Sequence, residues 1–238
     1  MTNFQLAEGR DTEKPLGMLY SMDCDDVPKD NLYWNYADIG IFFLVLVLIG
    51  LGLRLLVRFH LLPRSELSNP SVFLQILLIA SLTLALYLVL KLRHRRPVLY
   101  SLGWAWPRTL YVIVSLITGA LLASGVALYL HYSHGITPQI GILELLFLGL
   151  LLGPILEESF FRGCMLPLLA QTTGTVLSVV LTALLFALLH QPTDLAHWVS
   201  FTATGVAYGW IRVASGSTAA CAVSHASYNV GVFLFAAR

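Results

Sequence analysis

Long apolar runs cover most of this chain and restrict it to one kind of fold. Most of them contain about 18–25 residues, the length of a helix that crosses a lipid bilayer. We predict membrane spans over residues 39–57, 72–90, 110–130, 140–170, 176–190, 195–213 and 218–236. The apolar residues do not alternate with polar ones, as they would in a membrane β-barrel. The sequence therefore predicts an all-α fold, a polytopic transmembrane helical bundle with about seven spans.

The predicted span count has a range of six to eight, because the run 140–170 is too long for one perpendicular span. It predicts either one tilted helix or a helix kinked at Pro154, since proline is the commonest cause of a sharp kink. Dividing this run into two spans would also change the side of the membrane on which the chain ends.

The composition agrees with a membrane protein. Of the 238 residues, 57% are hydrophobic and 11% are charged, whereas about a quarter of the residues in a soluble domain are charged. The net charge of +1 indicates no nucleic-acid partner. We expect a multi-pass protein with the lipid bilayer as a partner, in the cell membrane or, in a eukaryote, the endoplasmic reticulum membrane. Cys24, Cys164 and Cys221 have no C-x-x-C spacing, and we predict the last two to be small core residues.

The chain divides into three predicted segments. Residues 1–37 form a polar tail without the early apolar stretch of a signal peptide, so the first span is expected to act as its own insertion signal. Residues 38–139 carry the N-terminal spans, and residues 140–238 form a core that carries most of the unusual polar residues.

Basic residues predict the orientation of the chain. They follow the second apolar run at positions 91, 93, 95, 96 and 108. Cytoplasmic loops carry an excess of lysine and arginine, so we place this loop and the N-terminus in the cytoplasm. Arg212 is assigned to the same side, and Trp104 and Trp106 are predicted to be interfacial anchors.

Glu157, Glu158 and Arg162 lie inside an apolar run. Charges in a membrane segment are rare and usually mark a site or a pathway. Adjacent helical residues point about 100° apart, so the two carboxylates cannot share one target. Glu158 and Arg162 have the acid-first, four-residue spacing of a helical ion pair. Glu157 is then free for general base or acid work, unless the whole cluster is a buried structural ion pair.

Three further polar residues, His190, His225 and Asn229, fall in the later runs. Alone, His190 can be an interfacial residue at a helix end. His225 and Asn229, four residues apart, can be hydrogen-bonding contacts between helices. Together with Glu157, however, they supply the groups that activate a water molecule and bind an oxyanion.

The depths of these residues set a condition on the fold. At about 1.5 Å per residue, Glu157 lies about 20 Å and His190 about 24 Å from the turn that joins their runs. The two side chains therefore share a level only if the helix continues past Arg162. His225 lies only about 12 Å from its own turn, so its depth differs mildly from that of Glu157 and His190.

These motifs, Glu157-Glu158-x-x-x-Arg162, Phe186-x-x-x-His190 and His225-x-x-x-Asn229, occur in one order on separate runs. In this order they resemble the CAAX protease and bacteriocin-processing (CPBP or Abi) family of intramembrane endopeptidases, which includes the type II CAAX prenyl endopeptidases. The resemblance covers about residues 140–236. Phe161-Arg162-Gly163 and Arg212-x-x-Ser215-Gly216-Ser217 are similar to the family as well.

The resemblance implies an intramembrane endopeptidase that cleaves a membrane-associated substrate near its C-terminus, with prenylated peptides or proteins as the best-known substrate class. It implies that Glu157 and His190 activate water, and that His225 and Asn229 stabilise the oxyanion. Glu158, Arg162 and Phe186 would then be structural or supporting residues. The competing hypotheses are a non-catalytic scaffold or immunity protein and an ion-coupled transporter; buried acidic and histidine residues are also typical of transporters.

The resemblance does not decide whether a metal cofactor is needed, because the family has been described both as metal-dependent and as glutamate-type. Glu157, His190 and His225 could hold a divalent metal such as zinc with one open position. The sequence has no H-E-x-x-H spacing, and Asn229 is a poor zinc ligand, which favours a metal-free mechanism.

The remaining polar residues have simpler interpretations. Glu144 is predicted near the start of its span, Asp194 as a helix cap, and His197 as a distant candidate for the site. Neither Ser159 nor Ser224 shows the pattern of a serine nucleophile. We predict the other histidines, His60, His94, His131 and His134, at the surface.

Overall fold

The computed structural model describes residues 34–68, 70–94, 97–134 and 141–236. These residues form helices and turns without a strand, which confirms the predicted all-α class. The predictions for Cys24, for the tail up to residue 33 and for Arg95 and Arg96 lie outside the described residues.

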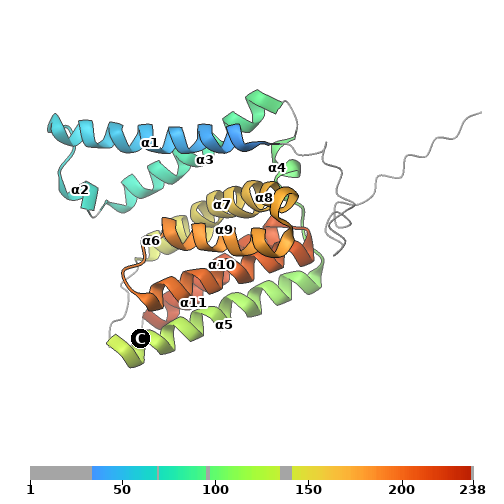
Figure 1. Cartoon of the computed structure of the whole chain (residues 1–238). Helices are drawn as coiled ribbons and strands as arrows, with labels where there is room; N and C mark the ends of the chain where they lie inside the picture. Colours follow the sequence, from blue (N-terminus) through green and yellow to red (C-terminus); the bar gives the residue numbers. More distant parts are fainter. Residues whose placement is uncertain (1–33, 69, 95–96, 135–140, 237–238) are drawn as a thin grey trace, which may run out of the picture.

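The first two apolar runs form an antiparallel helix pair (Figure 1). It consists of α1 (Tyr36–Arg58), the short α2 (Ser65–Ser68) and α3 (Val72–His94). Asn35 caps α1, since its side chain accepts a hydrogen bond from Ala37 N at 2.9 Å. Buried Asp38, at the start of α1, pairs with Arg93 and, at 2.7 Å, with His94 at the end of α3. The start of the first run and the end of the second therefore lie on one side, as the predicted topology requires.

A short helix, α4 (Val98–Ser101), leads to α5 (Thr109–His134), and one helical stretch then runs from Ile142 to Thr173. Its consecutive segments are α6 (Ile142–Glu144), η3 (Leu145–Leu152), α7 (Gly153–Glu158), η4 (Ser159–Met165) and α8 (Leu166–Thr173). Both η segments are π-helical and end two residues before a proline, Pro154 or Pro167. Proline has no N–H and its ring crowds the carbonyl four residues earlier, so a wider turn relieves the strain. The stretch continues past Arg162, which meets the condition derived from the depths of Glu157 and His190.

Three helices complete the fold, namely α9 (Thr175–Leu189), α10 (Leu195–Ser215) and α11 (Thr218–Ala236). All three pack against the long stretch, and α10 and α11 also pack against α5 (Figure 1). The contact between α5 and α11 is close, because a Cβ atom at Gly119 would lie 2.2 Å from the Ser224 carbonyl oxygen. Small residues at such contacts let the backbones of membrane helices approach one another.

Three of the described helical segments have the length and hydropathy of membrane spans. They are Tyr36–Arg58, Val72–His94 and Thr109–Tyr129, while Thr175–Leu189 is a shorter apolar helix of 15 residues. These three helices are those of an integral membrane protein, while the count of seven spans stays a prediction. In the stretch 142–173, π-helical segments divide the helix into short pieces, and α9 is shorter than a span.

Two sequence assignments need correction, because both residues contact the long helical stretch. Arg212 is buried and does not contribute to the charge of a loop; its Nε donates to the Arg162 carbonyl oxygen at 3.2 Å. Trp104 is partly buried and packs against the main hydrophobic core, and its Nε1 donates to the buried Ser159 Oγ at 2.8 Å, so it is not a free interfacial side chain. Trp106, by contrast, is 80% exposed, as an anchor would be.

Candidate active site

A cavity of about 290 Å³ lies between the long helical stretch and α3, α9, α10 and α11. It brings together all four residues that the sequence singled out as catalytic, namely Glu157, His190, His225 and Asn229. The other lining residues are Gln75, Ile79, Glu144, Leu145, Leu148, Gly149, Gly153, Phe186, Phe201, Thr204, Tyr228 and Val232. Concave, mostly apolar sites with a few convergent polar groups are typical of ligand and substrate pockets.

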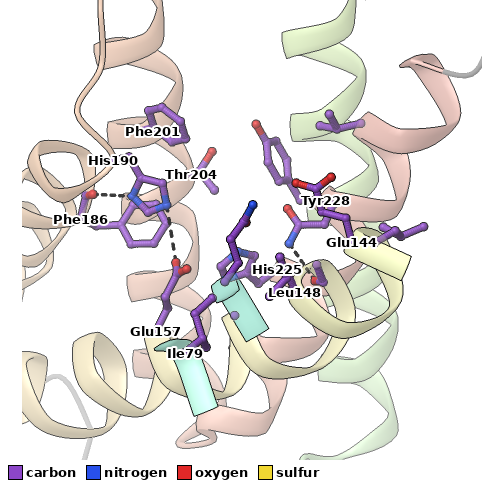
Figure 2. A pocket seen from close by; sticks show the side chains of 16 residues that line it. Ile79, Glu144, Leu148, Glu157, Phe186, His190, Phe201, Thr204, His225 and Tyr228 are labelled. Atoms are coloured by element: carbon purple, nitrogen blue, oxygen red, sulfur yellow. Dashed lines mark hydrogen bonds and ion pairs between the residues drawn. The ribbon is translucent and has the colours of Figure 1, made fainter. Parts of the chain in front are cut away.

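Glu157 and His190 face each other in this cavity (Figure 2). His190 Nε2 lies 3.6 Å from Glu157 Oε2, and each side chain is 28% exposed. His190 Nδ1 lies 2.7 Å from the Phe186 carbonyl oxygen. A carbonyl only accepts hydrogen bonds, so Nδ1 carries a hydrogen and Nε2 is the nitrogen turned to the carboxylate. The predicted common level of these two side chains is therefore confirmed.

Glu158 and Arg162 form the predicted ion pair, with 3.1 Å between Arg162 Nη1 and Glu158 Oε2. Both side chains are completely buried. Arg162 Nη2 also donates to the Gly205 carbonyl oxygen at 2.9 Å. The guanidinium lies 4.9 Å from the centroid of the Phe186 ring and 5.2 Å from that of Tyr208, within the range of cation–π attraction.

Glu158 has a second partner that the sequence did not indicate. His225 Nδ1 donates to Glu158 Oε1 at 2.9 Å, so one carboxylate joins Arg162 and His225. The Nδ1 atom of His225 is thereby engaged away from Glu157. The contact links residues 67 positions apart, which helical spacing alone cannot reveal.

Asn229 lies one turn after His225 on α11 and is held by the π-helical segment η3. Its Nδ2 donates to the Gly149 carbonyl oxygen at 2.8 Å. π-helical segments occur often at functional sites, where the wider turn changes which groups face a partner. The amide retains one N–H that this bond does not use.

Several lining residues were not among the predicted site residues. Glu144, expected only near the start of its span, lies with Tyr228 on the side of the cavity away from Glu157 (Figure 2). Gln75 is a polar residue in the otherwise apolar start of the second run, and that was the available signal for it. Phe201 gave no signal, because an aromatic residue in an apolar run is an ordinary core residue.

Asp194, His197 and the two described cysteines lie outside the cavity lining. Asp194 caps α10, as predicted, by accepting from His197 N at 2.9 Å. This backbone bond and the bond from the His197 ring lower the pKa of Asp194. His197 itself does not line the cavity. Cys164 and Cys221 are buried core residues, as predicted.

The remaining histidines and serines do not line the cavity either, as far as the structure describes them. Ser159 and Ser224 are buried and do not line the cavity. His60 is exposed, as predicted, whereas His94 is not a free surface residue because it pairs with Asp38. The side chains of His131 and His134 lie outside the part that the structure describes.

The donor set does not fit a metal ion held by three protein ligands. Among the described residues, no group of three or more His, Cys, Asp and Glu side chains is arranged to hold one. A zinc site needs its ligand atoms about 2.0–2.2 Å from one ion. We therefore derive no step through a metal.

An apolar, all-α chain with a glutamate–histidine pair in a partly open cavity has the features of a membrane hydrolase. Comparison with known families agrees with this class. Residues 137–231 match the family described as type II CAAX prenyl endopeptidase Rce1-like. This match supports the assignment of residues 137–231 to the CAAX protease family, a family of membrane proteases. No curated protein and no solved structure matches the chain.

Proposed function

We propose that this chain is an intramembrane endopeptidase that cleaves a membrane-associated peptide near its C-terminus. The observation that carries the proposal is the pair Glu157 and His190, 3.6 Å apart in a cavity that His225 and Asn229 also line. The family description favours prenylated substrates. The exposed apolar surfaces of α1, α3 and α5 fit a multi-pass protein of the cell membrane or the endoplasmic reticulum membrane.

In the proposed mechanism, Glu157 and His190 position and deprotonate one water molecule. Glu157 takes the proton as the water oxygen attacks the carbonyl carbon of the substrate. The new C–O bond produces a tetrahedral oxyanion. When the C–N bond breaks, the same proton passes to the leaving nitrogen, which departs as an amine. His190 orients the water, because the hydrogen bond from Nδ1 to Phe186 fixes the direction of Nε2.

The oxyanion is stabilised from the opposite side by α11. Asn229 offers the amide N–H that it does not give to Gly149. His225, when doubly protonated, offers Nε2–H, and the Glu158 carboxylate at Nδ1 stabilises that imidazolium. Glu158 and Arg162 therefore support the site without contacting substrate. Preorganised donors of this kind lower the energy of the charge that develops in the transition state.

The first test uses the purified protein with a quenched fluorogenic peptide that carries a prenylated cysteine near its C-terminus. We expect release of fluorescence and, by mass spectrometry, one new C-terminus. A peptide without the prenyl group measures how far the lipid contributes to recognition, and His190→Ala serves as the inactive control. Absence of cleavage of both peptides by the wild-type protein, or equal cleavage by His190→Ala, would refute the proposed function.

The second test concerns metal. Because the described side chains do not form a three-ligand cluster, we expect activity to stay within about twofold of its starting value after treatment with a strong chelator. Elemental analysis of the same sample is expected to show far less than one zinc ion per chain. Loss of activity on chelation that zinc restores would show that a metal takes part.

A further inference from the structure

The His190 imidazole lies between two aromatic rings that come from different helices. The centroid of Phe186, one turn earlier on α9, is 4.3 Å from that of His190, with 39° between the ring planes. The centroid of Phe201, on α10, is 4.6 Å away, with 29° between the planes. Separations and angles of this kind are favourable for aromatic pairs. Of these two rings, Phe201 is the one supplied by a different helix from that of His190.

His190 needs such a contact because of its place in the chain. It is the cap residue that ends α9, and the next residue, Gln191, has a positive φ of 49°. The bond from Nδ1 to the Phe186 carbonyl holds one edge of the ring. It leaves the ring able to tilt about that edge, which would move Nε2 relative to Glu157. Phe201 opposes this tilt, because it lies against the face of the imidazole.

Phe201 is itself held by the start of α10. Asp194 caps this helix, and the His197 ring bonds to the same carboxylate at 2.8 Å. The His197 ring also lies nearly parallel to that of Phe201, with 6.5 Å between centroids. Phe201 further packs against the main hydrophobic core. The contacts therefore run from Asp194 through His197 and Phe201 to His190.

We propose that Phe201 is a positioning residue that holds the His190 imidazole at its catalytic distance from Glu157. This inference rests on the proposed peptidase function, in which Nε2 of His190 orients the attacking water. A displacement of about 1 Å in a reacting geometry can lower a rate about 100-fold. Removing the ring at position 201 is therefore expected to slow the chemical step and to leave substrate binding nearly unchanged.

The kinetic test compares Phe201→Leu, which removes the aromatic face, with Phe201→Tyr, which keeps it. We expect kcat to fall about tenfold or more in Phe201→Leu, with KM within about twofold of wild type, while Phe201→Tyr retains most of kcat. Phe73→Leu is the matched control, because Phe73 is 76% exposed and lies away from the cavity lining. Equal kcat in Phe201→Leu and wild type, or an equal loss in Phe201→Tyr, would overturn the proposal.

A second readout does not depend on activity. The rings of Phe186 and Phe201 should shift the His190 Cε1–H resonance upfield, and this signal can be assigned among the seven histidines with His190→Gln. In Phe201→Leu we expect it to move downfield, while Phe73→Leu leaves it in place. An unmoved signal in Phe201→Leu would overturn the contact. If the signal moves in Phe201→Leu while the wild-type protein cleaves no peptide, the peptidase function is refuted and the contact between Phe201 and His190 stands.

Discussion

Replacing Glu157 with glutamine is expected to lower kcat by about 10²–10⁴-fold, the range that general acid–base catalysis usually contributes. Glutamine has nearly the same shape and retains a hydrogen-bonding oxygen, but it cannot accept a proton from water. The Oε2 atom that faces His190 at 3.6 Å is the group that is lost. KM is expected to change little, because the substitution alters the chemical step rather than the shape of the cavity.

The measurement is turnover of the fluorogenic peptide by purified wild type and Glu157→Gln at matched concentration. Glu144→Gln provides the matched control, since it makes the same chemical change on the other side of the same cavity. We expect this control to lower kcat by less than about tenfold. Turnover by Glu157→Gln within that same margin would exclude Glu157 as the base and return Glu157 to the structural interpretation.

Replacing Arg162 with methionine is expected to cause the largest loss of stability. It removes the guanidinium from a completely buried pair and leaves the Glu158 carboxylate without that charge partner. Breaking a buried ion pair in this way typically costs about 3–5 kcal/mol, much of it from the uncompensated charge. The substitution also removes the donor to the Gly205 carbonyl oxygen and the cation near the Phe186 ring.

A second variant separates the loss of charge balance from the loss of packing. Glu158→Gln combined with Arg162→Met removes both charges and keeps an amide oxygen that can accept from His225 Nδ1. Replacing a whole buried pair is often neutral or stabilising, so the double variant should be more stable than Arg162→Met alone. A double variant that is no more stable than the single one would contradict this account of the pair.

Unfolding can be followed by the reactivity of buried thiols. Cys164 and Cys221 are free and buried, so a thiol-reactive dye should label them only as the protein unfolds. A Cys24→Ser background removes the third thiol. The exposed Arg64 supplies the control, and Arg64→Met should leave the labelling temperature nearly unchanged. An equally small change in Arg162→Met would show that the buried pair contributes little to stability.

Local spacing predicted a large part of the site. The four-residue step from Glu158 to Arg162 implied their ion pair, because that step sets two side chains on one helical face. The level shared by Glu157 and His190 followed from the rise per residue, given a continuous helix. These predictions succeeded because each depends on the geometry of one or two helices and not on how the whole bundle packs.

Other features depend on contacts that spacing cannot show. The bond from His225 to Glu158 joins α11 to the long helical stretch, so it exists only once both are packed together. The sequence predicts Arg212 as a cytoplasmic basic residue, yet the packed helices bury it against the Arg162 carbonyl. The sequence predicts Trp104 as an interfacial anchor, yet its indole N–H donates a hydrogen bond to the buried Ser159 hydroxyl.

By itself, the sequence determined the all-α class, the apolar runs and the small set of polar residues that lipid-facing helices would exclude. These follow from hydropathy and helical period, which are local properties. Only the tertiary structure decided that the Glu157 and His190 side chains lie next to each other, that His225 also bonds to Glu158, and that the Phe201 ring lies against His190. Those contacts join residues of different helices, so they depend on how the helices pack, and hydropathy alone does not say which faces of two apolar helices meet.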